Sequence, residues 1–459
     1  MIRTRLKEIV DDCFRAGVRE NQWSDAAADK YTVEVPKHEN QGDFSTNMAL
    51  VLAGIEKKNP REIAAQVVKR LKNVQELIER VEIAGPGFVN VTIKESVWQQ
   101  LLKEIDDQQE SYGRSDIGGN RRVMVEFVSA NPTGPLSIGH GRQAILGDGI
   151  ARLLEATGHD VYREYYYNDA GRQMRVLGES VRARYLELLG RDHEFPEDGY
   201  QGEYIYDIAR KLVETEDQSL ADCESVDPFK QAAERTIFED ISTTLKRMGI
   251  SFDNYYNEQS LYENGHVDSV IKELTDKGLV YEKDGATWFK TTELGQEKDR
   301  VIIKSSGEPT YRLPDIAYHR EKFRRNFDWL VDIFGSDHIA TVPDVRAGVE
   351  ALGYDSSKIT VILHQFVTLM RDGKQVKMST RKANFITVDE LLDEVGVDAA
   401  RFFFMMRKPD SQLEFDLDLA TKESQENPVY YVQYAHARVC SILRQAVEKG
   451  VALPTTADA

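Results

Sequence analysis

The sequence predicts an α/β protein built on a doubly wound parallel sheet, and three observations carry that prediction. The first is the stretch RVMVEFV (122–128), which is apolar and β-branched, as buried parallel strands are. The second is the glycine-rich loop that follows it and leads into a helical pattern from about Gly139 to Ala156. The third is the next strand pattern, DVYREYYYN (160–168). Strand, loop, helix and strand form a βαβ unit, in which ligands bind at the carboxyl ends of the strands.

Two later strand patterns extend the predicted sheet. WLVDIFG (329–335) and ITVILHQFV (359–367) enclose the helical stretch VPDVRAGVEAL. The sheet is therefore split along the chain, and we expect a helical insertion around residues 185–305 between its halves. From about Val388 onward the patterns are helical.

The residues before the sheet predict a separate α+β domain, 1–112. The N-terminal stretch MIRTRLKEIVDDCF places charges within an apolar periodicity, which indicates an amphipathic helix and not a signal peptide. Asn59 and Pro60 suit the cap and first position of a second helix. VEIAGPGFVNVTI then predicts two strands around a Gly-Pro-Gly turn, and SVWQQLLKEI predicts another helix. The turn-rich residues 111–120 make a linker.

Composition limits the class of protein. The chain has 459 residues, 41% of them hydrophobic, and a formal net charge of -18, so we expect a soluble acidic protein of several domains. Cys13, Cys223 and Cys440 lie far apart without C-x-x-C spacing, which predicts neither a disulfide framework nor a zinc site and suits the cytoplasm. No stretch approaches the ~18 apolar residues of a membrane span. We expect no metal site.

The loop NPTGPLSIGHGR contains more special residues than a plain turn requires. A helix N-terminus has free N–H groups and a partial positive charge, so it attracts phosphate, and Gly139 and Gly141 would let a ligand approach. His140 between them could donate a hydrogen bond to a phosphate oxygen. The loop matches neither the P-loop pattern nor the G-x-G-x-x-G fingerprint. A tight turn with a satisfied histidine is an equal alternative.

A second stretch favours the phosphate interpretation. LMRDGKQVKMSTRKANFITVDELL (369–392) gathers five basic residues around Lys-Met-Ser before a helix: Arg371, Lys374, Lys377, Arg381 and Lys382. Alone, such a run is more often a solvated face. Together with the Gly-His-Gly helix start, it could clamp a triphosphate from two sides and stabilise the leaving pyrophosphate. That arrangement suits adenylyl transfer.

These residues carry a resemblance to a known family. PLSIGHGR resembles the HIGH signature, and KMSTRK the KMSKS signature, of class I aminoacyl-tRNA synthetases. The blocks VEFVSANPTGPLSIGHGRQAILGD, YYYNDAGRQM, YRLPDIAYH, MSTRKANFITVDELLDEVGVDAARFFF and ENPVYYVQYAHAR together resemble bacterial arginyl-tRNA synthetases.

The resemblance implies a domain organisation. It comprises an N-terminal tRNA-binding domain, a Rossmann-like catalytic domain with its insertion, a KMSKS-type loop with a helical stem-contact region, and the first part of an all-helical anticodon-binding domain. The corresponding residues are 1–112, 120–375, 376–425 and 426–459.

The resemblance also implies an activity. Arginine and ATP give arginyl-adenylate and pyrophosphate, and the arginyl group then passes to the 3′-terminal ribose of arginine tRNA. Mg²⁺ accompanies ATP, zinc is not needed, and in this family activation generally requires bound tRNA. We expect a cytoplasmic monomer with arginine, ATP and arginine tRNA as partners and no membrane.

Site residues follow from the matched motifs. His140, Lys377 and Ser379 are the implied catalytic residues. ATP binding is implied for Ser137, Gly139, His140, Lys377, Met378 and Ser379. Arginine binding is implied for Glu126, Asn131, Tyr311, Asp315, Asp337 and His338. Carboxylates suit this pocket because a guanidinium presents planar donors. The alternatives are an exposed strand-end acid at Glu126, a first-turn carboxylate at Asp315, a core tyrosine at Tyr311 and plain loop residues at Asp337 and His338.

Three departures from the family pattern leave other functions open. Ser137 stands where HIGH begins with histidine, and Thr380 stands where KMSKS has its second lysine. The family also continues beyond the last helix of this chain, so we expect most of the anticodon-binding domain to be missing and tRNA affinity to fall. A non-catalytic tRNA-binding protein and a nucleotidyltransferase acting on another small molecule are the two alternatives.

Overall fold

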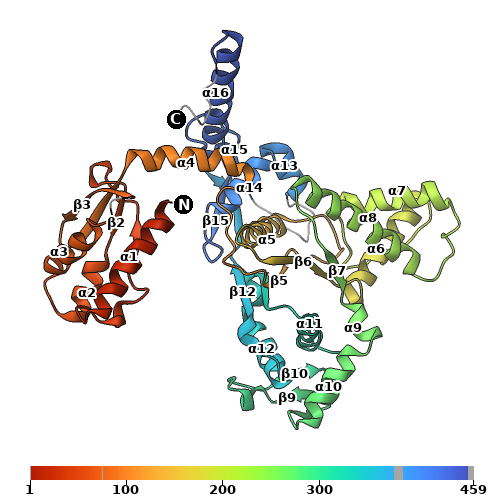
Figure 1. The fold of residues 1–459 in the computed structure, drawn as a ribbon. Coiled ribbons are helices and arrows are strands. Elements are labelled where there is room, and N and C mark those ends of the chain that lie inside the picture. The colour runs from red at the N-terminus through yellow and green to blue at the C-terminus, as the bar shows by residue number, and fades with distance from the viewer. Residues whose placement is uncertain (1, 75, 377–385, 453–459) are drawn as a thin grey trace. The chain divides into compact units, whose positions relative to one another are not determined.

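The fold is given by a computed structural model, which describes residues 2–74, 76–376 and 386–452 (Figure 1). Two compact units divide the chain, one of Met1–Arg114 with Cys440–Ala459 and one of Ser115–Val439. The predicted Lys377, Met378, Ser379, Thr380, Arg381 and Lys382 lie outside the described residues.

The first unit contains a four-stranded antiparallel sheet in the order β1-β2-β4-β3. Asn59 caps its third helix as predicted, because its side chain accepts a hydrogen bond from the backbone N–H of Arg61. The predicted strands around Gly-Pro-Gly are confirmed. The elements are α1 (Ile2–Arg19), β1 (Val33–Glu34), β2 (Phe44–Thr46), α2 (Met48–Glu56), α3 (Pro60–Leu71), β3 (Ile78–Ala84), β4 (Phe88–Ile93) and α4 (Glu95–Gln108).

The second unit is organised by a five-stranded sheet whose order is β12-β11-β5-β6-β7 and whose neighbours are all parallel. The predicted doubly wound sheet is thus confirmed. Helices cover both faces, with α5 and α11 on opposite sides (Figure 1). The elements that build this part are β5 (Arg122–Glu126), α5 (Ile138–Ala156), β6 (Asp160–Tyr167), β7 (Asn254–Asn257), α11 (Arg312–Arg324), β11 (Trp329–Gly335), α12 (Val342–Ala351) and β12 (Ile359–His364).

Helix α5 packs tightly on the central strand. A Cβ at Gly147 would collide with the ring of Phe127, and one at Gly141 would come within 2.9 Å of Val388 Cγ2. Glycine at these two positions therefore lets the helix approach both the sheet and the segment that begins at Val388. The close approach fixes the N-terminus of α5 beside the carboxyl ends of the strands.

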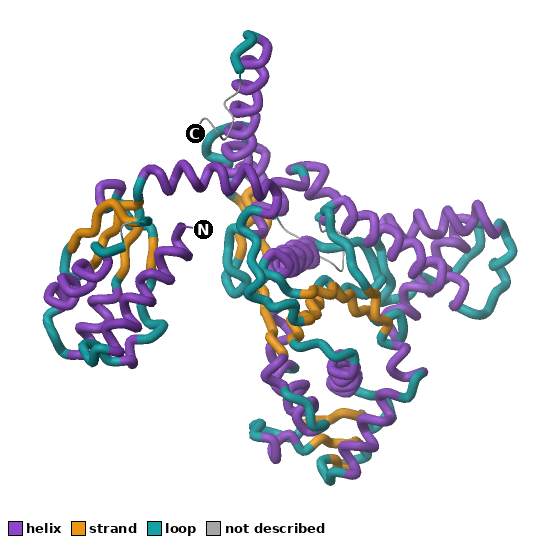
Figure 2. The backbone as a smooth tube through the Cα atoms, viewed as in Figure 1, coloured by secondary structure: helices purple, strands orange, loops and turns teal. Residues whose placement is uncertain are grey.

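The insertion differs from the expected run of helices. Residues 171–247 form helices joined by loops (Figure 2), but β7 then returns to the main sheet and a small antiparallel sheet, β10-β9-β8, follows. A strand of four residues such as β7, NYYN, is too short to give a periodic signal. The elements are α6 (Gly171–Leu188), α7 (Glu203–Glu216), α8 (Asp227–Arg247), α9 (Gln259–Glu263), α10 (His266–Asp276), β8 (Val280–Lys283), β9 (Ala286–Phe289) and β10 (Arg300–Ile303).

The last part of the chain is largely, but not wholly, helical. A parallel pair between β13 and β15 interrupts the expected helices, because Leu413 and Phe415 alternate with charged residues and bury one face. The elements are β13 (Val367–Arg371), β14 (Lys374–Gln375), α13 (Val388–Val395), α14 (Val397–Met405), β15 (Leu413–Asp416), α15 (Leu417–Thr421) and α16 (Pro428–Glu448).

Candidate active site

A cavity of about 680 Å³ lies at the carboxyl ends of β5, β6 and β11, where a doubly wound sheet binds its ligands. Every described residue that the sequence predicted for the site lines this one cavity. These residues are Glu126, Asn131, Ser137, Gly139, His140, Tyr311, Asp315, Asp337 and His338. They come from five separate segments, so the fold brings together residues up to about two hundred positions apart in the sequence.

In the cavity wall, Ser137 and His140 form a reciprocal cap on α5. The Ser137 side chain accepts a hydrogen bond from the His140 N–H, and His140 Nδ1 lies 3.3 Å from the Ser137 backbone N. Because a backbone N–H can only donate, Nδ1 accepts, and a neutral ring carries its proton on Nε2. Burial, with a smaller contribution from His364, lowers the pKa of His140 to about 4, so the ring is neutral near pH 7.

Replacing Ser137 by alanine should therefore destabilise the start of α5. Loss of an N-cap hydroxyl typically costs about 1 kcal/mol of unfolding free energy, and we expect the thermal midpoint to fall by about 1–3 °C. Ser137→Thr keeps a hydroxyl and should melt close to the parent chain. Equal thermal midpoints for the alanine variant and the parent chain would show that the cap contributes nothing to the free energy of unfolding.

The segment after the Lys-Met-Ser stretch is anchored beside this cap. The Val388 N–H donates to the Leu136 carbonyl at 2.9 Å, and Thr387 forms an isolated antiparallel bridge with Ser137. Thr387 also opens α13 with its own capping box to Glu390. The described residue nearest to the basic stretch on its C-terminal side, Ile386, thus lies next to a bonded pair at the N-terminus of α5.

Asp315 also lines the cavity, from the first turn of α11. Among the described residues, no side chain donates a hydrogen bond to its carboxylate and no cation pairs with it, so its charge is free for a ligand. Burial, assisted by Glu258 and Glu126 and opposed by His319 and Lys322, raises the pKa of Asp315 to about 7.

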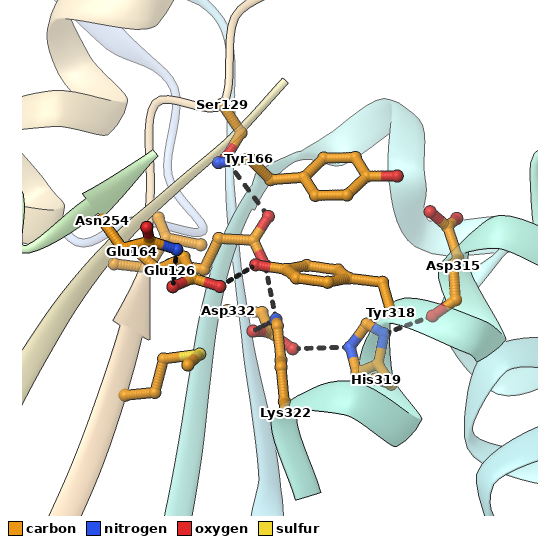
Figure 3. Close-up of polar contacts among 12 residues, drawn as sticks. Glu126, Ser129, Glu164, Tyr166, Asn254, Asp315, Tyr318, His319, Lys322 and Asp332 are labelled. Carbon is orange, nitrogen blue, oxygen red and sulfur yellow. Dashed lines mark hydrogen bonds and ion pairs between the residues drawn. The ribbon is translucent and has the colours of Figure 1, made fainter. Parts of the chain in front are cut away.

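Glu126 also reaches the cavity, but its carboxylate already has protein partners (Figure 3). It is buried, it contacts the Lys322 ammonium, and it accepts a hydrogen bond from the Ser129 hydroxyl at 3.1 Å. The alternative of an exposed strand-end acid is wrong, because only 2% of Glu126 is exposed.

The remaining predicted residues form the rim. Tyr311, the residue before α11, is 79% exposed, so the alternative of a core tyrosine is wrong. Asn131 Oδ1 accepts a hydrogen bond from the Asn168 N–H at 2.9 Å. Asp337 and His338 belong to a short 3₁₀ helix, Ser336–Ala340, directly after β11, and the His338 ring stacks on Phe334.

Among the polar residues of the cavity wall that sequence reasoning missed, three are joined by hydrogen bonds. Glu258 accepts hydrogen bonds from the Tyr166 hydroxyl and the Asn168 amide, each at 2.7 Å, and all three line the cavity. Each lies at or just after the carboxyl end of β6 or β7. Recognition of β7 as a sheet strand would have singled out Glu258, but four residues gave no strand pattern.

Within 2–74, 76–376 and 386–452, no group of three or more His, Cys, Asp or Glu side chains is placed to hold a metal ion. In the same ranges, no helix is both long and apolar enough to cross a membrane.

Comparison with known proteins gives consistent matches. The family model described as "tRNA synthetases class I (R), catalytic domain" matches residues 100–427, and "Arginyl tRNA synthetase N terminal domain" matches residues 1–93. The arginine–tRNA ligase of Desulfotalea psychrophila is 73% identical over 451 residues, covering 98% of this chain and 82% of that protein. The arginine–tRNA ligase of Salinibacter ruber is 51% identical over 444 residues, covering 93% and 79%.

A solved structure shares the fold. The arginyl-tRNA synthetase of Thermus thermophilus superposes with a TM-score of 0.71 and covers 100% of this chain and 84% of its own, at 21% identity. At that identity the likeness concerns the fold alone.

Proposed function

Because this chain belongs to the arginyl-tRNA synthetase family of class I synthetases, we propose that its cavity binds arginine at the Asp315 end and ATP at the His140 end. The chain is an arginine–tRNA ligase. It forms arginyl-adenylate from arginine and ATP with release of pyrophosphate, and it then transfers the arginyl group to the 3′-terminal ribose of its tRNA. One observation carries the assignment of the cavity: all nine described residues implied by the family motifs line it.

The arginine end is proposed on electrostatic grounds. Asp315 offers a carboxylate that has no hydrogen-bond donor or cation partner in the described part of the chain, and Glu258 lines the same cavity. A guanidinium is always charged and presents its donors in a plane, so it suits carboxylates held in a buried wall. Tyr311, Asn131, Asp337 and His338 are proposed to complete the pocket from the rim, and Glu126 from the floor.

The ATP end is proposed from the start of α5. Gly139 leaves room for a close approach, and the helix N-terminus offers backbone N–H groups to a phosphate. A neutral His140 keeps an Nε2–H donor there without adding a charge that would attract a competing anion. Lys377, Met378 and Ser379 are proposed to close over the triphosphate. The anchoring of Val388 to Leu136 supports this, because it holds the described residues that follow these three in the sequence beside the same helix start.

Some finer assignments rest on the family alone. We propose Mg²⁺ bound with ATP as part of the substrate, no zinc, a monomer and a cytoplasmic location. For the domains we propose tRNA binding by 1–112, catalysis by 120–375, contact with the tRNA stem by 376–425 and the start of an anticodon-binding domain at 426–459. Light scattering of the purified chain tests the monomer, and a titration of Mg²⁺ against activity tests the metal.

Arginine binding should strengthen as pH rises through about 7. The arginine side chain stays cationic, whereas Asp315, with a pKa of about 7, is mainly protonated at pH 6 and mainly ionised at pH 8. Its ionised fraction rises about tenfold over that interval, and we expect the arginine KM to fall by a similar factor. Steady-state kinetics at pH 6, 7 and 8 measure this. An arginine KM that is flat or rises with pH would contradict the role of Asp315.

Exchange of labelled pyrophosphate into ATP tests the activity itself. We expect exchange that depends on arginine and on added arginine tRNA. Lysine in place of arginine is the control, and it should support no exchange. Tight tRNA binding without any exchange would instead favour a non-catalytic tRNA-binding protein.

A further inference from the structure

Three carboxylates stand in one row across the parallel sheet. Asp332 on β11 is in register with Glu126 on β5, and Glu126 is in register with Glu164 on β6. Register partners of neighbouring strands point to the same face of a sheet, and all three residues are buried. Buried like charges at adjacent positions repel one another, so the row requires cations from the element that covers it.

Helix α11 supplies Lys322, which Figure 3 shows beside Glu126 and Asp332, and the residue after the helix supplies Arg325. The Lys322 ammonium contacts the Glu126 carboxylate and donates to Asp332 Oδ1 at 2.6 Å. The Arg325 guanidinium donates to the two oxygens of Glu164 at 2.6 and 2.8 Å. Each cation therefore neutralises a different part of the row.

Of the three carboxylates, Glu126 is the one that lines the cavity within the described part of the chain. One of its oxygens contacts Lys322, and the other accepts the hydrogen bond from Ser129, which also lines the cavity. Lys322 is fully buried behind Glu126 and is not part of the cavity wall. It can therefore influence a ligand through Glu126 without touching that ligand.

We propose that Lys322 is a positioning residue for arginine, which fixes the Glu126 carboxylate in one orientation at the cavity floor. The proposal rests on the arginine site proposed above. Burial raises the pKa of Glu126, and the Lys322 ammonium opposes that rise. Asp332 also contacts His319, whose Nε2 lies 3.0 Å from Asp332 Oδ2, so Asp332 would keep a partner without the ammonium. Glu126 would lose the cation that it contacts while a second buried acid stays beside it, and it would take up a proton or turn away.

The contact between Lys322 and Glu126 gives Glu126 and Asp315 different roles in the pocket. Lys322 offsets the charge of Glu126, so Glu126 contributes an acceptor of fixed direction. Asp315, without a cation partner among the described residues, contributes the unbalanced negative charge that attracts arginine. Removal of Lys322 should accordingly disturb arginine recognition and leave ATP recognition alone.

Lys322→Met and Arg325→Met form a matched pair of variants. Both remove a cation from the same row, but only Lys322 contacts the acid of the cavity wall. We expect Lys322→Met to raise the arginine KM by about tenfold or more with the ATP KM within about twofold, and Lys322→Arg to recover part of the loss. Arg325→Met should leave the arginine KM within about twofold. An unchanged arginine KM in Lys322→Met, or an equal rise in Arg325→Met, would overturn the proposal.

A double variant covers the case in which Lys322→Met does not fold. Glu126→Gln with Lys322→Met removes both charges of the contact, and circular dichroism checks that the chain is folded. If Lys322 acts through Glu126, the double variant has the arginine KM of Glu126→Gln alone. A further rise of about tenfold would show an independent action and overturn the proposal. Arginine-dependent exchange by the parent chain is measured first, because its failure would reject the proposed function and not the role of Lys322.

Discussion

Asp315→Asn should raise the arginine KM by about 10- to 100-fold while leaving the ATP KM within about twofold. Asparagine has nearly the shape of aspartate but lacks its charge, so the change removes a charge-assisted contact without opening a cavity. The effect should be large because the Asp315 carboxylate has no hydrogen bond or ion pair within the described part of the chain. Steady-state aminoacylation with arginine and ATP varied separately measures both constants.

Asp328→Asn is the matched control. Asp328 is an exposed aspartate at the opposite end of the sheet, where it accepts a hydrogen bond from the Arg122 N–H, and its loss should leave the arginine KM unchanged. An Asp315→Asn chain with normal arginine affinity would reject Asp315 as the main arginine ligand. An equal rise of the arginine KM and the ATP KM would indicate that the substitution disturbs the whole cavity and not arginine binding alone.

His140→Ala should lower kcat for arginine activation by about 100-fold or more. The proposed Nε2–H donor meets charge that develops on the phosphate in the transition state, and such preorganised donors act most strongly where water is excluded. Because His140 belongs to the proposed ATP end and not to the proposed arginine end, the arginine KM should change little. Pyrophosphate exchange with saturating arginine, ATP and tRNA measures the effect.

His159→Ala provides the comparison. His159 lies just before β6, at the amino end of the strand and away from the cavity, and its removal should leave kcat within about twofold. A His140→Ala chain that retains most of its exchange activity would mean that the N-terminal amides of α5 bind the phosphate without help from the imidazole.

Local patterns predicted the part of the site that depends on a single turn. The βα unit from Val125 to Ala156 could be recognised because strand, glycine-rich loop and helix are contiguous, and each carries its own signal. The role of Ser137 could not be read in the same way. The motif match implied only ATP binding for Ser137, and the structure shows in addition that it caps α5 through a reciprocal contact with His140.

Contacts between distant segments could not be predicted from those patterns. Lys322 lies 196 positions from Glu126, and nothing in the sequence around either residue indicates the other. The β7 strand and Glu258 were missed because four residues are too few for periodicity, and β15 was missed because its two buried residues lie between helices. In each case the strand or helix on which the segment packs, and not the local sequence, decides whether the strand or the contact forms.

The most direct test of the central claim is a crystal structure of the chain with a non-hydrolysable arginyl-adenylate analogue. The account predicts the guanidinium within about 3 Å of the Asp315 carboxylate, and the phosphate position within hydrogen-bonding distance of His140 and the N-terminus of α5. An analogue bound in the opposite direction, or outside this cavity, would contradict the division into an arginine end and an ATP end.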